Sequence, residues 1–236
     1  MFKLSEESLL VIAPHPDDEV LGCAGLMSRI KKSGGKVYVL YLTVGTTADY
    51  SKAGKSTAAD RIKEIERAAA FFELDGYDIS FKGNEFHLQL DKLPLHNIIN
   101  SLEAGTAVSI NKIRPTIIAT SQLTDYNQDH RACQLAVMAA VRPSPRKMKP
   151  YTPVVLGYEF AANGWGISNP SQPNFYVGLD DRDIGKKIEA MELYESQARE
   201  YPHTRSTEVI RSLAILRGSQ SGTEFAESYV IYRISL

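Results

Sequence analysis

The stretch LLVIAPHPDDE at residues 9–19 decides how the chain folds. Its apolar run, residues 9–13, predicts a buried strand that ends at Pro14, because proline cannot continue the hydrogen-bond ladder of a sheet. Beyond it, apolar residues recur every three to four positions across residues 20–30 and two glycines follow, which predicts a helix. One histidine and three acids therefore lie between a strand and a helix, at the edge where open α/β sheets bind their ligands.

The rest of the chain repeats this alternation of strand and helix, which is typical of a parallel sheet. Further strands are expected at residues 36–43, 77–81, 114–121, 152–159, 175–179 and 229–234, and helices at 57–74, 93–110, 131–141, 182–199 and 206–217. No Ser/Gly-rich linker divides the 236 residues. We therefore expect one α/β, Rossmann-like domain over residues 1–236, with a mainly parallel sheet flanked by helices.

Composition narrows the classes of function. The chain carries 27 basic and 28 acidic residues, which argues against non-specific nucleic-acid binding and against a polybasic membrane anchor. No apolar run approaches the roughly 20 residues that span a bilayer. Two cysteines, Cys23 and Cys133, make no disulfide framework and are expected to be small core residues, so a reducing, cytoplasmic location is expected. A small, specific substrate fits this composition best.

A second polar cluster, DYNQDHRA at residues 125–132, also follows a predicted strand and precedes a predicted helix. Two such loops on one parallel sheet can converge, which would bring His15, Asp18 and His130 together. Two imidazoles and one carboxylate, with a fourth position open to water, form a recurring catalytic zinc site. Asp17 lies next to one of these ligands and could take a proton from the water, so hydrolysis of a carbonyl compound is the expected reaction.

Each of these residues also has a purely structural interpretation. An isolated histidine at a strand end is usually a hydrogen-bonded polar residue, and an acid such as Glu19 is stabilised by about 0.3–1 kcal/mol in the first turn of a helix. Burying Asp17 and Asp18 beside a histidine is costly without a cation, which favours a metal site. Asp129 is expected either to orient a neighbouring site residue or to cap the following helix. The loop at residues 161–174, which carries the only tryptophan, could form a wall of the site.

PHPDDE at residues 14–19, together with DYNQDHRA, resembles the PIG-L/LmbE family of zinc-dependent de-N-acetylases, which hydrolyse an acetyl group from N-acetylated amino sugars. The likeness extends along most of the chain, through motifs at residues 61–68, 187–197 and 217–227. Residues 158–174 and 202–206 are similar to members that act on sugars of surface polysaccharides or on nucleotide sugars.

Carried over residue by residue, the resemblance implies that His15, Asp18 and His130 bind zinc. It implies that Asp17 is the general base, and that the same carboxyl group returns the proton to the departing amine. It also implies that Arg61 binds sugar hydroxyls of the substrate.

One position departs from the family pattern. Several members carry a histidine three residues before the second metal histidine, where it stabilises the tetrahedral oxyanion; here that position is Asn127. Asparagine can donate a neutral hydrogen bond but cannot carry a proton. We therefore expect Asn127 to polarise the carbonyl together with zinc, and Asp17 alone to handle protons. His203, reaching the substrate from a distant loop, is the alternative replacement for the absent imidazole.

The sequence thus predicts a zinc-dependent hydrolase that deacetylates a small N-acetylated amino sugar, whether free, nucleotide-linked or lipid-linked. No nucleic-acid partner and no membrane span are expected. A homo-oligomer is compatible with the sequence, since many relatives self-associate, but the sequence does not fix the oligomeric state. Two alternatives stay open. One is a metal-dependent hydrolase of another ester or of a phosphoester, using Mg²⁺ or Mn²⁺, and the other is a non-catalytic sugar-binding protein with a remnant metal site.

Overall fold

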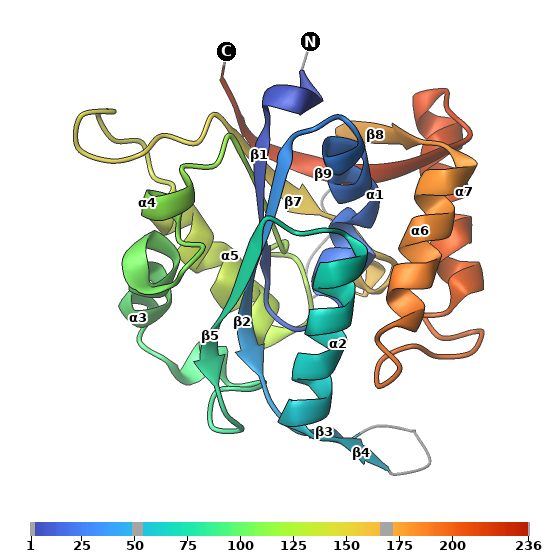
Figure 1. Ribbon diagram of the computed structural model, residues 1–236, viewed down its shortest axis with the longest axis horizontal. Helices are drawn as coiled ribbons and strands as arrows, with labels where there is room; N and C mark the ends of the chain where they lie inside the picture. The colour runs from blue at the N-terminus through green and yellow to red at the C-terminus, as the bar shows by residue number, and fades with distance from the viewer. Residues whose placement is uncertain (1–2, 49–53, 166–171, 236) are drawn as a thin grey trace.

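The computed structural model describes residues 3–48, 54–165 and 172–235, which are built around a seven-stranded sheet (Figure 1). Its strands lie in the order β5 (Gly76–Lys82), β2 (Lys36–Val44), β1 (Ser8–Ala13), β6 (Ile117–Thr120), β7 (Val154–Tyr158), β9 (Phe225–Ile234) and β8 (Phe175–Leu179). The first five run parallel to one another, and β9 is antiparallel to both of its neighbours. The predicted α/β fold with a mainly parallel sheet is confirmed.

Helices cover both faces of this sheet (Figure 1). On one face lie α1 (Asp18–Lys32), α2 (Ala58–Phe71), α6 (Asp181–Glu192) and α7 (Thr207–Ser221), and on the other α3 (Leu95–Asn100), α4 (Ile110–Ile113) and α5 (Gln128–Ala140). Strand β1 contributes Leu9, Val11 and Ala13 to the first hydrophobic core and Leu10 and Ile12 to the second. Alternate side chains of a strand point to opposite faces, so a strand that is apolar throughout is buried on both.

The helix predicted at residues 93–110 is interrupted. Helix α3 passes into a π-helical turn, η3 (Ser101–Gly105), and α4 begins only at Ile110. Gly105 is a poor helix former, and Thr106 after it adopts an extended conformation, with φ −129° and ψ 166°. Short elements complete the described chain: the 3₁₀ turns η1 (Leu4–Glu6), η2 (Leu90–Lys92) and η4 (Ala161–Gly164), and a small hairpin of β3 (Thr47–Ala48) and β4 (Lys55–Ser56).

A buried ion pair fastens helix α1 to strand β9. The carboxylate of Glu227 accepts hydrogen bonds from the backbone N–H groups of Gly25 and Leu26, both at 2.8 Å, and from the ammonium of Lys187 at 2.7 Å. Lys187 also donates to the carbonyl oxygen of Leu21, at 2.7 Å. Buried charges are tolerated only when they are paired and hydrogen-bonded, as these are. This network holds in place the helix whose first turn carries part of the site.

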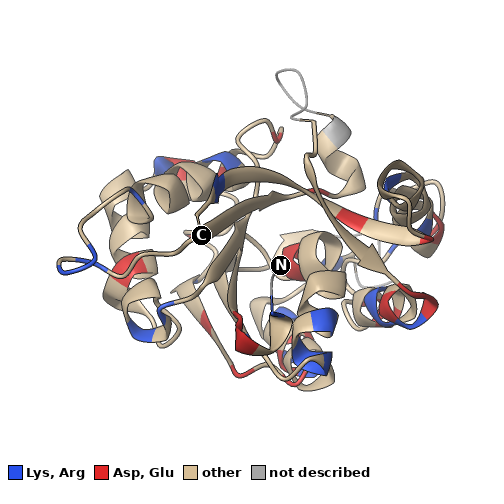
Figure 2. Cartoon of the chain, turned by 90° about the horizontal axis from the view of Figure 1, so that it is seen from above, with Lys and Arg blue, Asp and Glu red and all other residues tan. Residues whose placement is uncertain are grey.

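Basic and acidic residues are mixed along the helices on both sides of the sheet, in keeping with the net charge of −1 (Figure 2). Among the described residues, no helix is both long enough and apolar enough to cross a membrane.

Candidate metal centre

The loop between β1 and α1 forms the first half of the site. Asp17, the residue before α1, has φ 106°, in the left-handed region that residues other than glycine rarely adopt. Such a conformation costs about 1–3 kcal/mol and persists only where the surroundings hold it. Here the backbone N–H of Asp17 donates to Glu19 Oε2 at 3.2 Å, the N–H of His15 donates to Asp18 Oδ2 at 2.9 Å, and Arg61 donates to the carbonyl of Pro16 at 2.8 Å.

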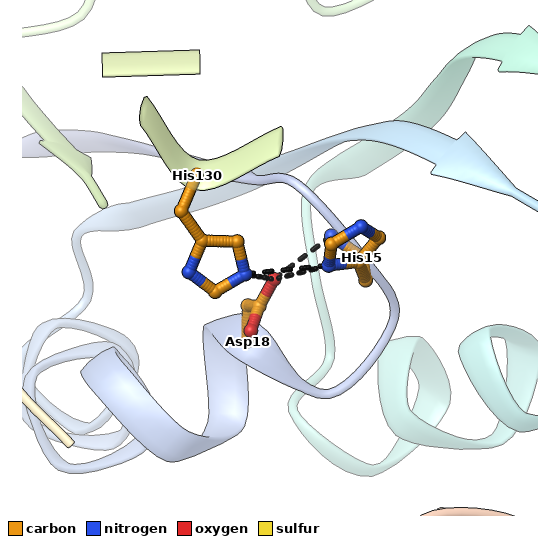
Figure 3. Close-up of side chains that lie close together, drawn as sticks. All are labelled: His15, Asp18 and His130. Carbon is orange, nitrogen blue, oxygen red and sulfur yellow. Dashed lines mark hydrogen bonds and ion pairs between the residues drawn. The ribbon is translucent and has the colours of Figure 1, made fainter. Parts of the chain in front are cut away.

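The loop between β6 and α5 forms the second half. Asn127 caps α5, because its side-chain Oδ1 accepts a hydrogen bond from the N–H of Asp129 at 2.9 Å. Its own N–H donates to Asp125 Oδ1 at 2.9 Å, and Arg131 donates to the carbonyl of Asp125 at 2.9 Å. These bonds fix the first turn of α5, from which His130 projects toward the β1–α1 loop (Figure 3).

The two loops bring three ligand atoms together, all from buried side chains (Figure 3). His15 Nδ1 lies 3.3 Å from His130 Nε2 and 3.4 Å from Asp18 Oδ2, and His130 Nε2 lies 3.2 Å from Asp18 Oδ2. Three ligands of a tetrahedral zinc ion, each 2.0–2.2 Å from the metal, lie about 3.3–3.6 Å apart. The type and the spacing of the donors therefore fit one metal ion, with a fourth position left for water or substrate.

The opposite nitrogen of each imidazole contacts a further carboxylate. His15 Nε2 lies 3.0 Å from Asp129 Oδ2, and His130 Nδ1 lies 2.8 Å from Asp125 Oδ2. Asp129 also accepts from the N–H of Leu90 at 3.0 Å. Histidines that bind metals usually donate their second N–H to such a carboxylate, which fixes the ring and leaves the other nitrogen free to bind.

The histidines and aspartates of this cluster shift one another's pKa values. Burial by itself lowers the pKa of His130, but Asp18 and Asp125 raise it to about 10. Burial likewise lowers the pKa of His15, whereas its contacts with Asp129 and Asp18 give a net rise. Burial raises the pKa of Asp18, and the two histidines bring it well below its usual value. Without a metal at neutral pH, the proton on His130 offsets part of the negative charge of the carboxylates, and a metal cation would take the place of that proton.

Asp17 differs from the other acids of the site. It is only 1% exposed, and no described residue donates a hydrogen bond to either of its carboxylate oxygens. Its one close charged contact among the described residues is an ion pair with Arg205, whose Nε lies 3.0 Å from Oδ2 but is not aligned as a hydrogen-bond donor. Burial raises the pKa of Asp17, and Arg205 opposes the rise. A buried carboxylate without a donor is expected to have a ligand or water as its partner.

The other predicted site residues differ in how far they are buried. Asn127 is half-buried, and among the described residues its amide nitrogen has no partner, so that nitrogen is free to donate. Arg61 is buried and bonds to Pro16 and to Thr47 Oγ1, at 3.0 Å, while its Nε has no partner in the described chain. His203 lies exposed in a turn, where its Nδ1 accepts from the N–H of Arg205 at 3.1 Å.

Several site contacts are absent from the sequence prediction. Asp125 lies inside the quoted motif, five residues before His130, and this spacing was the available signal. Glu19, which sequence alone leaves undecided between site and helix turn, accepts from Tyr194 at 2.5 Å as well as from Asp17. Arg205 comes from a distant turn, within the stretch 202–206 that resembles family members, but the sequence assigns it no role at the metal site.

His87 is buried, and its ring centroid lies 5.4 Å from that of His15. Burial lowers the pKa of His87 to about 4, with His15 and Arg61 acting in the same direction. His87 is therefore neutral, and it packs edge-on against the first metal histidine without adding charge to the cluster.

Fold and site together define a class: an α/β protein with a buried candidate site for one metal ion at the carboxyl edge of a Rossmann-like sheet. The chain belongs to the PIG-L family, whose model, described as GlcNAc-PI de-N-acetylase, matches residues 10–141. The predicted family membership is confirmed.

Two comparisons extend the likeness over nearly the whole chain. The chain is 25% identical over 238 residues to the diacetylchitobiose deacetylase of Thermococcus kodakarensis, covering 96% of this chain and 85% of the relative. It superposes on the conserved protein TT1542 from Thermus thermophilus with a TM-score of 0.71 and 26% identity, covering 98% and 96% of the two chains.

A third comparison shows that the fold by itself does not identify the reaction. The chain is similar in structure to 4-carboxy-2-hydroxymuconate hydratase from Pseudomonas putida, with a TM-score of 0.72 and 18% identity over 98% of each chain. That likeness shows the fold alone. A shared fold does not determine a reaction, so the argument for this chain depends on its site.

Proposed function

We propose that this protein is a zinc-dependent hydrolase that removes the acetyl group from an N-acetylated amino sugar or its conjugate. One observation carries the proposal: three buried donors spaced for a single metal ion lie beside a buried carboxylate without a hydrogen-bond donor in the described chain. Membership of the PIG-L family and the likeness to a diacetylchitobiose deacetylase support an N-acetyl sugar as the substrate.

The donor set favours zinc over a harder cation. Two imidazole nitrogens and one carboxylate oxygen are a recurring ligand set of catalytic zinc, whereas Mg²⁺ prefers octahedral oxygen ligands. A zinc ion held by His15, Asp18 and His130 would act as a Lewis acid on the acetyl carbonyl and would make water acidic enough to react near neutral pH. Asp125 and Asp129 would hold the two imidazoles in the orientation that presents one nitrogen to the cation.

Asp17 is the group that moves protons in this proposal. Its carboxylate takes a proton from the attacking water and later gives that proton to the nitrogen of the departing amine, so one residue serves as base and then as acid. Arg205, at 3.0 Å, positions the carboxylate without occupying either oxygen with an aligned hydrogen bond. The raised pKa caused by burial suits a carboxyl group that must hold a proton between these two steps.

Asn127 donates to the carbonyl oxygen as negative charge develops on it. Its backbone is fixed by Asp125 and its Oδ1 by the N–H of Asp129, so its amide nitrogen is held in place without rotation. A preorganised donor of this kind is worth about 100- to 1,000-fold in rate. We further propose that Arg61, through its unpartnered Nε, and His203, from its exposed turn, contact sugar hydroxyls.

The phosphoester alternative has less support. A two-metal phosphatase would need further free carboxylates, and the described chain offers one group of three ligands. Asp125 and Asp129 each have an oxygen committed to a histidine. A non-catalytic sugar-binding role would not explain why the two buried carboxylate oxygens of Asp17 accept no hydrogen bond from the described chain. A single domain and a cytoplasmic location remain our expectations.

The proposal is tested by mass spectrometry on a panel of N-acetylated amino sugars, with free acetate and free phosphate measured in parallel. The zinc-loaded protein is expected to release one acetyl group as acetate and no phosphate. Asp17→Asn is the matched control, because it keeps the size of the side chain and leaves the three metal donors unchanged. Phosphate release, or no product from any member of the panel, would contradict the proposal.

A further inference from the structure

The turn at residues 194–197, which follows helix α6, contains three buried polar side chains that the proposed reaction does not use. Tyr194 is fully buried, and Ser196 and Gln197 are nearly so. Glu195, between them, lies on the surface, with a side chain that is 72% exposed and paired with Arg67. Burying hydroxyl and amide groups is costly unless each has a partner, so their partners indicate what the turn stabilises.

Tyr194 is connected to the backbone of Asp17 through Glu19. The hydroxyl group of Tyr194 donates to Glu19 Oε1 at 2.5 Å, and Glu19 Oε2 accepts from the backbone N–H of Asp17 at 3.2 Å. This N–H belongs to the residue with φ 106°, a conformation that persists only where neighbouring groups hold it. Glu19 therefore fixes the strained backbone from which the Asp17 side chain projects, and Tyr194 fixes Glu19.

A simple role in the first helical turn does not account for the burial of Glu19. An acid at that position is stabilised by the helix dipole while it remains in water. Glu19 is only 1% exposed, so it has lost its hydration, and its two oxygens accept from Tyr194 and Asp17 instead. The buried hydroxyl group of Tyr41 lies 3.3 Å from that of Tyr194. The carboxylate of Glu19 is therefore held by a buried hydrogen-bonded network.

Gln197 is connected to the carboxylate of Asp17 through Arg205. Its Oε1 accepts from Arg205 Nη1 at 3.2 Å, and Arg205 Nε lies 3.0 Å from Asp17 Oδ2. The side chain of Arg205 is 33% exposed, so without a second contact it could turn toward solvent and leave Asp17. Holding a long side chain in one orientation costs conformational entropy, and the hydrogen bond to Gln197 offsets part of that cost.

Ser196 and Glu64 orient the amide of Gln197. Gln197 Nε2 donates to Ser196 Oγ at 3.0 Å, and the carboxylate of Glu64 accepts from both the N–H and the hydroxyl group of Ser196, each at 2.7 Å. The oxygen of the Gln197 amide is thereby left facing Arg205. Helix α2, which carries Glu64, thus holds the turn whose side chains lead by two routes to Asp17.

We propose that the 194–197 turn positions Asp17 for proton transfer, fixing its backbone through Glu19 and its carboxylate through Arg205. This role rests on the proposed function, in which Asp17 takes a proton from water and returns it to the amine. Two separate routes to one residue restrain both the origin and the direction of its side chain, as a precisely placed proton acceptor requires. Because Tyr194 and Gln197 act through other residues, they are positioning residues.

Substitutions in the turn test the two routes separately. Tyr194→Phe keeps the buried ring and removes the donor to Glu19. Gln197→Met keeps the length of the side chain and removes the acceptor for Arg205. Each should lower kcat about 10- to 100-fold, with KM and zinc content unchanged, for the N-acetyl sugar of the panel that the wild-type protein deacetylates fastest. Glu195→Ala, in the same turn but on the surface, is the matched control and should keep the wild-type kcat.

Two further comparisons separate positioning from general stability. Glu19→Gln retains an oxygen for the N–H of Asp17 and should keep most of the wild-type kcat, whereas Glu19→Ala should lose about 10- to 100-fold. In protein that already carries Asp17→Asn, Tyr194→Phe and Gln197→Met should lower the residual rate no further, because no carboxylate is left to position. Full kcat in both single variants, or the same fold-loss in the Asp17→Asn background, would overturn the proposal.

Crystal structures of the zinc-loaded variants provide a readout that needs no turnover. In Gln197→Met the distance between Arg205 Nε and Asp17 Oδ2 should exceed 3.0 Å, and in Glu19→Ala the φ of Asp17 should depart from 106°. Unchanged Asp17 geometry in both variants would overturn the positioning role even if acetate is released. Altered geometry, with no acetate released by the wild-type protein, would support the positioning role and contradict the proposed function.

Discussion

Zinc binding to the metal-free protein should displace protons, in an amount that the structure sets. In the metal-free cluster the pKa of His130 is about 10, because Asp18 and Asp125 outweigh the opposite effect of burial. An imidazole nitrogen must be unprotonated to bind a metal. Adding Zn²⁺ at neutral pH must therefore remove a proton from His130, and the free energy of that removal weakens the apparent affinity.

The size of this loss of zinc affinity follows from the pKa of His130. At pH 7, His130 lies three pH units below its pKa of about 10, which costs about 4 kcal/mol, or about a thousandfold in affinity. Apparent zinc affinity should therefore rise about tenfold for each unit of pH between 7 and 9. The same shift stabilises the metal-free fold below pH 6.5, and that contribution is lost as pH rises toward 10.

Calorimetry in two buffers of different ionisation enthalpy measures the number of protons released on zinc binding and the dissociation constant. About one proton should be released per zinc ion between pH 7 and 8, and the dissociation constant should fall by about two orders of magnitude from pH 7 to pH 9. Asp125→Asn should release fewer protons, because it removes one of the two carboxylates that raise the pKa of His130. An affinity that is independent of pH in this range, with no proton released, would refute the reasoning.

Substitutions at four residues test the remaining roles. Asp17→Asn should lower the rate of acetate release by about 10²- to 10⁴-fold with zinc content unchanged, and loss of zinc in parallel would contradict its role as base. Asp129→Ala frees one metal imidazole and should weaken zinc binding about 10- to 100-fold in competition with a chelator; unchanged affinity would exclude this role. Asn127→Ala should slow turnover about 100- to 1,000-fold, as should Asn127→Asp, which keeps the helix cap but has no amide donor; full turnover in both would dismiss the oxyanion role. Glu227→Ala leaves a buried ammonium unpaired and should cost about 3–5 kcal/mol in denaturant unfolding, whereas a loss below about 1 kcal/mol would show that the ion pair is unimportant.

Much of the fold could be predicted because its signals are local. An apolar strand followed by a helical repeat marks β1 and α1 directly, and the same alternation marks the parallel strands. The antiparallel pairing of β9 with β7 and β8 has no comparable signal, because it joins segments that are distant in the sequence. The break between α3 and α4 was missed because the apolar spacing continues across Gly105, while the backbone there turns.

The site residues differ in the same way: local sequence signals allow some of them to be predicted, whereas others depend on contacts between distant segments. His15, Asp18 and His130 could be placed together because both loops leave the carboxyl ends of neighbouring parallel strands, β1 and β6. Arg205 and Asn163 lie in stretches whose resemblance to family members is noted above, but the sequence assigns neither residue a role at the metal site. Their contacts depend on tertiary packing, which sequence periodicity does not describe.

The most direct test of the metal site is the anomalous difference density of a crystal of the zinc-loaded protein, recorded on both sides of the zinc absorption edge. We predict a single strong peak about 2.0–2.2 Å from His15 Nδ1, Asp18 Oδ2 and His130 Nε2, with the Asp17 carboxylate facing the fourth position. A peak elsewhere, or none between these three atoms when zinc is present in stoichiometric amount, would contradict the account.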